Sequence, residues 1–172
     1  MTWTAPQVER PDFGTVGDER TLLEAFLDYH RQTLLRKCSG LTAEQLKMAS
    51  TPPSNLTLLG LIRHMTDVEH GWFTNRTPEA SLPFRYWSPE GDSDFDGVAD
   101  ADAEADLATY LDECQAARDA AAKLSLEHTF VSPRSKKEFN LRWVYIHMIE
   151  EYARHNGHAD LIREAIDGAT GE

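Results

Sequence analysis

Apolar residues recur at helical spacing in four long segments of the chain. These segments cover residues 18–40, 56–75, 101–124 and about 140–166. Gly40 ends the first segment and Gly168 follows the last, as is typical of helix ends. The pattern predicts four long amphipathic helices whose apolar stripes pack together, and hence an all-α four-helix bundle.

Local signals refine these helices. A short helical turn is expected at residues 42–49, and the break TPPSN offers Ser54 or Asn55 as the N-cap of the helix that follows. The third segment is rich in alanine and strongly helical. Its residues expected to face the interior are Leu107, Tyr110, Leu111, Cys114 and either Ala117 or Ala121.

The connecting segments show no such period. Residues 1–17 are polar and rich in proline, so we expect a surface arm that precedes a single domain, residues 18–172. Residues 78–102 and 125–139 are expected to be long loops, the second with too little alternation to form a sheet. Loops as long as 78–102 often cover a functional site.

Charge and cysteine content narrow the function classes. The 29 Asp and Glu residues against 17 Lys and Arg repel phosphate backbones and anionic lipids, so neither nucleic acid nor a membrane is an expected partner. No apolar run approaches the roughly 20 residues that span a bilayer, and no signal peptide is evident. Cys38 and Cys114 form neither a CxxC nor a secreted disulfide pattern, so the expected location is the reducing cytoplasm.

The run EEYARHNGHAD, residues 150–160, concentrates polar side chains in the last segment. At about 100° per residue, Glu151 and His155 point toward the apolar stripe, whereas Glu150 and Arg154 point toward solvent. One helical turn brings the donor atoms of Glu151 and His155 to a common point, which suits a metal. The alternative is a hydrogen-bonded pair at the edge of the core, although a buried carboxylate favours a cation.

His64 is the candidate third ligand, from a neighbouring helix. It lies at one edge of the apolar stripe of residues 56–75, where Gly60 and Gly71 leave room beside an imidazole. Three protein ligands leave a coordination position open, which is typical of catalytic metal sites. Such a position can polarise a carbonyl, activate water or deprotonate a bound thiol.

Other polar residues are candidates for supporting roles. His158 is the candidate catalytic acid or base, and His147 and Glu69 are candidates for contacting the ligands from outside. A salt bridge to an arginine is the favoured interpretation of Glu69, which falls on the apolar stripe of its helix. His70 points away from that stripe and is expected at the surface.

Two further patterns are interpreted as structural. DSDFDG, residues 92–97, has the opening spacing of a calcium loop, but Ala103 occupies the twelfth position, where a bidentate glutamate is needed. A solvated acidic loop is therefore expected there. Cys38 and Cys114 lack a histidine at local spacing, and Cys114 fits the core, so neither is an expected nucleophile.

The blocks SNLTLLGLIRHMTDVEHGWF and HMIEEYARHNGHADLIREAIDG resemble the DinB-like superfamily of four-helix metalloproteins. The resemblance covers nearly the whole chain from about Asp18. It is closest to the mycothiol-associated branch, which includes the metal-binding domain of mycothiol-dependent maleylpyruvate isomerase. It implies an up-down-down-up bundle that holds a divalent metal, usually zinc or nickel, between its helices. Zinc is the metal expected for this chain, with nickel as the alternative.

The resemblance also implies the ligands. His64 matches the histidine that helix two supplies, and His155 matches the second histidine of helix four. Most members carry another histidine four residues before that one, where this chain has Glu151, as the isomerase branch does. His158 matches a position that is not a ligand.

A thiol-dependent metalloenzyme follows from this resemblance, because related proteins are S-transferases that use low-molecular-weight thiols such as mycothiol or bacillithiol. Isomerase activity is not expected, since the isomerase carries an additional C-terminal domain and this chain ends just after its fourth helix. The hypothesis is a metal-dependent S-transferase that acts on a small electrophile, with a homodimer as the expected assembly. The alternatives are a hydrolase that uses metal-activated water, and a non-catalytic stress protein that binds metal or a small molecule.

Overall fold

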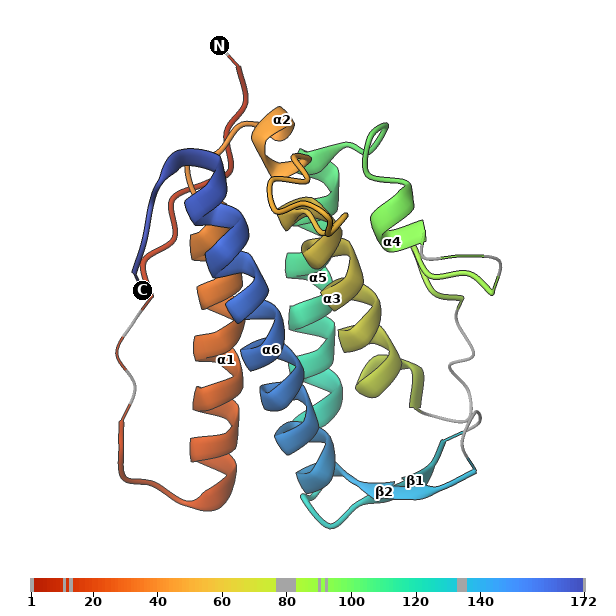
Figure 1. Cartoon of the computed structure of the whole chain (residues 1–172). Coiled ribbons are helices and arrows are strands. Elements are labelled where there is room, and N and C mark those ends of the chain that lie inside the picture. Colours follow the sequence, from red (N-terminus) through yellow and green to blue (C-terminus); the bar gives the residue numbers. More distant parts are fainter. Residues whose placement is uncertain are drawn as a thin grey trace.

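Helices dominate the computed structural model, which describes residues 2–10, 12, 14–76, 83–89, 91, 93–132 and 136–171. The long helices are α1 (Glu19–Cys38), α3 (Leu58–Trp72), α5 (Ala103–Ala121) and α6 (Leu141–Asp167). Figure 1 shows these four side by side, with α3 and α5 running opposite to α1 and α6. The closest packing joins α1 to α6 and α3 to α5, and α3 also packs against α6.

Each long helix begins at a side chain that accepts a hydrogen bond from its first turn. The four N-caps are Asp18, Thr57, Asp102 and Asn140. The expectation of Ser54 or Asn55 as the second cap is wrong, because Thr57 Oγ1 accepts the Gly60 N–H at 2.9 Å. Gly168 ends α6 with φ +77°, a left-handed conformation that favours glycine.

The apolar faces of the long helices meet in one core. Among the largest fully buried side chains are Leu27, Leu34, Leu61, Ile62, Met65, Tyr110, Met148 and Tyr152. The prediction that Leu111 faces inward is wrong, since its side chain is 49% exposed. Tyr110, Cys114 and Ala117 already fill the inner face of α5, and Leu111 lies about 100° further round the helix.

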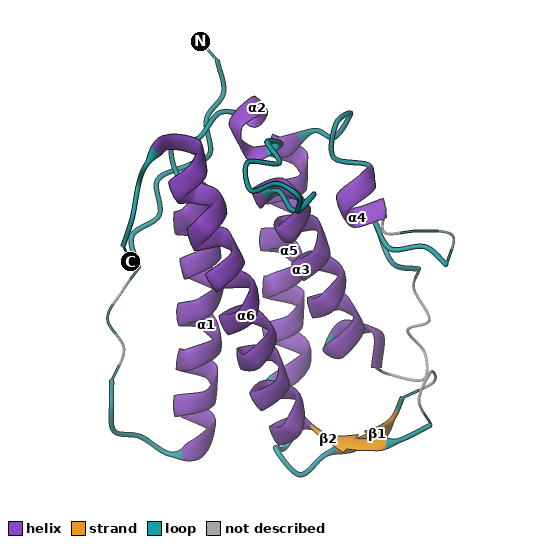
Figure 2. Ribbon diagram, in the orientation of Figure 1, coloured by secondary structure: helices purple, strands orange, loops and turns teal. Residues whose placement is uncertain are grey.

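The segment 125–139, predicted to contain no sheet, holds a small antiparallel hairpin (Figure 2). Its strands are β1 (Thr129–Val131) and β2 (Glu138–Asn140), with Phe130 paired with Phe139. The strands have three residues each, too few for an alternating pattern to appear in the sequence. Phe139 packs against Trp72 and Trp143, so the hairpin covers one end of the helices.

The arm and the first connection are attached to the helices. Ala5 is buried and exchanges backbone hydrogen bonds with Gly40 and Leu41, so the arm lies less on the surface than expected. The short helix α2 (Ala43–Leu46) falls within the turn predicted at residues 42–49. Among the described residues, no helix is both long and apolar enough to cross a membrane.

Asp67 of α3 holds the long connection between α3 and α5. Its two carboxylate oxygens accept the backbone N–H groups of Arg85, Tyr86 and Trp87 at 2.8, 2.8 and 2.7 Å. Tyr86 Oη also donates to Asp106 of α5 at 2.9 Å. The connection, of which residues 77–82, 90 and 92 lie outside the described part, then forms the short helix α4 (Ser93–Asp96), which packs against α3.

Candidate metal centre

His64, Glu151 and His155 come together between α3 and α6. One donor atom from each residue lies within 4.8 Å of the other two, and the His64 and His155 rings are 4.8 Å apart. Within α6, Glu151 Oε2 lies 3.5 Å from His155 Nε2, as one helical turn requires. The side chains of His64, Glu151 and His155 are 28, 19 and 12% exposed, so a small molecule can reach the group.

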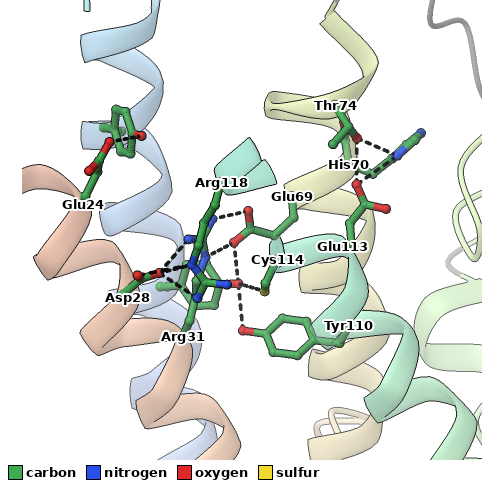
Figure 3. A network of polar contacts seen from close by, with 12 residues as sticks. Glu24, Asp28, Arg31, Glu69, His70, Thr74, Tyr110, Glu113, Cys114 and Arg118 are labelled. Carbon is green, nitrogen blue, oxygen red and sulfur yellow. Dashed lines mark hydrogen bonds and ion pairs between the residues drawn. The ribbon is translucent and has the colours of Figure 1, made fainter. Parts of the chain in front are cut away.

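A buried polar network beside this group fixes α6 against α3 (Figure 3). Glu69 of α3 accepts hydrogen bonds from Arg31 Nε at 2.7 Å and Nη2 at 2.6 Å, and from Tyr152 Oη at 2.7 Å. Because Tyr152 donates to Glu69, the 2.9 Å contact between the two tyrosine oxygens has Tyr110 as its donor. Tyr152 follows Glu151 directly. The network therefore fixes the position of α6 relative to α3 at the candidate ligands.

Glu69 therefore has the arginine partner that its place on the apolar stripe indicated. Its carboxylate is fully buried in an ion pair with Arg31. Burial raises the pKa values of Tyr152 and Tyr110 well above the ordinary value of a tyrosine, so both hydroxyl groups stay protonated and can donate hydrogen bonds. The role of Glu69 is to join three helices, α1, α3 and α6, next to the site.

Asp94 lies at the candidate site, although the sequence predicts that it is in a solvated loop. Its Oδ2 lies 2.8 Å from Nδ1 of His64, and the residue is 4% exposed. The interpretation of DSDFDG as a solvated acidic loop is thus wrong for the buried Asp94, and Asp96 is exposed as expected but belongs to the helix α4. The only hint in the sequence was an acidic run within a connection long enough to cover a site.

Gly60 explains how α4 comes so close to α3. A Cβ atom at Gly60 would lie 2.7 Å from the Phe95 ring, which is too close for any side chain. The space that the sequence assigned to the His64 imidazole is therefore taken by Phe95, whose ring lies 5.6 Å from the His64 ring. This contact brings the neighbouring Asp94 down onto His64.

His155 is neutral at physiological pH. Burial, followed by the nearby His64, His158 and Arg154, lowers its pKa from 6.5 to about 4. His158 Nδ1 lies 3.4 Å from His155 Nδ1, on the opposite edge of the ring from the Nε2 that faces Glu151. In the tautomer that carries its proton on Nδ1, this neutral imidazole directs an Nε2 lone pair toward the Glu151 side.

His147 contacts the other oxygen of Glu151. Its Nε2 lies 3.6 Å from Glu151 Oε1, and its ring stacks on Trp143 at 4.8 Å. His147, Glu150 and Glu151 form a second set of donors within 4.8 Å of one another, but Glu150 is exposed and already paired with Arg154. The structure thus places His147 beside the Glu151 carboxylate.

Comparison with known families assigns the chain to one of them. The family model described as mycothiol-S-transferase matches residues 22–168, a range that contains His64, Asp94, Glu151 and His155. The chain belongs to the mycothiol-S-transferase family. This family is DinB-like, which confirms the resemblance seen in the two sequence blocks. No curated protein matches the chain significantly.

In this mycothiol-S-transferase family member, neither cysteine is placed to act as the nucleophile. Cys38 and Cys114 are both buried. Burial raises the pKa of each thiol to about 12, so both stay protonated at neutral pH. Cys114 belongs to the core, as predicted, with its sulfur 4.0 Å from Tyr152 Oη.

The prediction that His70 lies at the surface is wrong. Its side chain is buried, with Nδ1 3.3 Å from Glu113 Oε1 of α5 and 2.9 Å from Thr74 Oγ1. Thr74 Oγ1 and Arg85 Nη2 also donate to Glu113, at 2.7 and 2.9 Å. The polar side of α3 is covered here because α5 and the long connection pack over it.

Glu113 is expected to contribute to stability in a pH-dependent way. Burial alone would raise its pKa, but hydrogen bonds from His70, Thr74 and Arg85 outweigh burial and lower the pKa from 4.5 to about 2. A carboxyl with a lowered pKa in the folded state stabilises the fold above about pH 4.5 and loses that contribution as the pH falls toward 2. Glu113→Gln should therefore lower the free energy of unfolding at pH 7 by about 1–3 kcal/mol.

Urea unfolding at several pH values tests this expectation. The variant should show a shallower loss of stability than the wild type between about pH 4.5 and pH 2. Asp112→Asn, which changes an exposed carboxylate of the same helix, is the matched control and should follow the wild-type curve. Parallel curves for Glu113→Gln and the wild type would contradict the assignment.

Proposed function

We propose that this chain is a divalent-metal-dependent S-transferase for a mycothiol-type thiol, and that His64, Glu151 and His155 hold the metal. The observation that carries the proposal is the convergence of three donors from two helices in a member of the mycothiol-S-transferase family. We further propose that α1, α3, α5 and α6 form the up-down-down-up four-helix bundle of the DinB-like type, with the glutamate-containing ligand set of the isomerase branch.

The residues present fit such a cation. Two imidazoles and one carboxylate are a typical donor set for catalytic zinc, and a neutral His155 has a lone pair to give. The structure also shows a buried polar atom without a partner at the site: nothing among the described residues donates to Oδ1 of Asp94. A buried carboxylate oxygen without a partner is costly, and a cation on the adjacent His64 would offset that cost.

The chemistry divides between the cation and the chain. A divalent cation, when bound, supplies the positive charge that lowers the pKa of a thiol, so that the sulfur is a thiolate at neutral pH. Glu151 and His155 hold their donor atoms one helical turn apart, and His147 orients Glu151 from outside. His158, whose ring lies beside His155, is the candidate group for accepting the proton that the thiol releases.

Metal content and thiol transfer, measured on the same wild-type samples, test this function. We expect one zinc per chain after reconstitution, and metal-dependent consumption of mycothiol with small electrophiles. A chelator should stop the reaction and added zinc should restore it, with nickel as the second metal to compare.

The other outcomes separate the alternatives. Protein that binds no divalent metal would overturn the ligand assignment. Bound zinc without thiol turnover across several electrophiles would indicate a binding protein, and turnover that needs water but no thiol would indicate a hydrolase. Gel filtration of the same samples shows whether the active species is the expected homodimer.

A further inference from the structure

The contact between Asp94 and His64 links the long connection to the metal centre. Asp94 Oδ2 lies 2.8 Å from His64 Nδ1, and the Asp94 side chain is 5% exposed. Because an ionised carboxylate only accepts hydrogen bonds, this distance requires a proton on Nδ1. The contact therefore selects the tautomer of His64 in which Nε2 carries the lone pair.

We infer that Asp94 is a positioning residue of the metal centre, acting through His64. The inference rests on the proposed function, since it assigns Asp94 a role toward the metal that His64, Glu151 and His155 are proposed to hold. Histidine ligands commonly donate their second ring N–H to a carboxylate, which fixes the ring and makes it a stronger ligand. Asp94 supplies that acceptor from outside the two ligand-bearing helices.

Asp94 is placed to orient a ligand and not to be one. The donor atoms that lie within 4.8 Å of one another are those of His64, Glu151 and His155, and the group does not extend to Asp94. Asp94 nonetheless lies next to the site, because its Oδ2 is 2.8 Å from Nδ1 of the ligand candidate His64. Its effect on a cation is thus electrostatic and orientational.

The fold holds Asp94 in this position by three contacts. Gly60 lets Phe95 pack against α3 directly above His64. Asp67, one turn after His64, binds the backbone of residues 85–87 before the chain reaches α4. Arg63 lies within hydrogen-bond distance of the Gly97 carbonyl, at 3.3 Å, just after α4. The helix that carries His64 therefore holds the chain both ahead of α4, at residues 85–87, and just after α4, at Gly97.

Zinc affinity of the metal-free protein is the first test. Competition with a chromophoric zinc chelator should show Asp94→Ala binding zinc about 10- to 100-fold more weakly than the wild type. Asp94→Asn keeps an acceptor without the charge and should fall between the two. Asp96→Asn, an exposed acid on the same short helix, is the matched control and should bind as the wild type does.

Two readouts separate positioning from a merely structural role. In a double-mutant cycle, Asp94→Ala should weaken zinc binding in the wild type but not further in His64→Ala, because its effect passes through that ring. Nitrogen-15 shifts of the His64 ring in the metal-free protein should show a single tautomer with the proton on Nδ1. The same spectrum of Asp94→Ala should show a mixture of tautomers.

The failures of the two proposals are distinguishable. Wild-type protein that binds no zinc would overturn both the proposed function and the role of Asp94. Wild-type and Asp94→Ala proteins with equal zinc affinity would overturn only the role of Asp94, as would an equal loss in the His64→Ala background. Where His64→Ala binds too weakly for the cycle, mixed tautomers in the wild type would overturn the role and a single Nδ1–H tautomer would support it.

Discussion

Glu151→Ala is expected to lose bound zinc and thiol-transfer activity together while keeping its fold. Glu151 is the anionic member of the proposed ligand set, and two oxygens of one carboxylate meet His155 and His147. Removing a residue that only orients a metal ligand already weakens metal binding about 10- to 100-fold. Removing the ligand itself should weaken zinc binding by more than that. Zinc per chain and initial rates with mycothiol, measured on the same samples, report the two effects.

Glu150→Ala is the matched control for this variant. Glu150 is the adjacent residue, has the same chemistry, and forms an exposed pair with Arg154 that contributes at most about 1 kcal/mol. It should keep its zinc and its rate. Full zinc occupancy in Glu151→Ala would remove Glu151 from the ligand set, and a lost fold, visible by circular dichroism, would point to a structural role.

Glu69→Ala is expected to destabilise the protein by about 3–5 kcal/mol, because it leaves the Arg31 guanidinium buried without its counter-charge. The Arg31 and Glu69 side chains are 5% and 0% exposed, so water cannot compensate. The substitution also removes the acceptor of Tyr152 Oη and opens a cavity between α1, α3 and α6. Urea unfolding of wild-type and variant protein measures the change.

A paired substitution shows whether the charge is the cause. Arg31→Met combined with Glu69→Gln removes both charges and keeps an acceptor for Tyr152, so it should recover part of the lost stability. Glu150→Ala again serves as the control and should unfold within about 1 kcal/mol of the wild type. A loss of less than about 1 kcal/mol for Glu69→Ala itself would show that the network contributes little to stability.

Features that depend on local spacing could be predicted from the sequence. Glu151 and His155 lie one turn apart on any helix, so their common direction follows from helical phase once the apolar stripe is known. The partner of Glu69 could be anticipated in kind, because a carboxylate on an apolar stripe needs a cation. Which arginine serves, Arg31 of α1, depends on how the helices pack and carries no signal in the sequence.

Features that depend on tertiary packing were mispredicted. His70 was expected in solvent because a single helix shows only its own apolar stripe, whereas α5 and the long connection cover a second side of α3. Asp94 was assigned to solvent for a related reason. Its helix has four residues, too few to show a period, and its inward direction is set by Gly60 on a different helix.

The way Asp67 holds the long connection has a consequence for how the protein could diversify. Its carboxylate recognises main-chain N–H groups at positions 85–87, which every amino acid except proline provides. The side chain of Trp87 is 42% exposed and is not what fixes the segment. The side chain at such a position can therefore change, in evolution or in a mutant library, while the hydrogen bonds from the backbone of residues 85–87 to Asp67 remain.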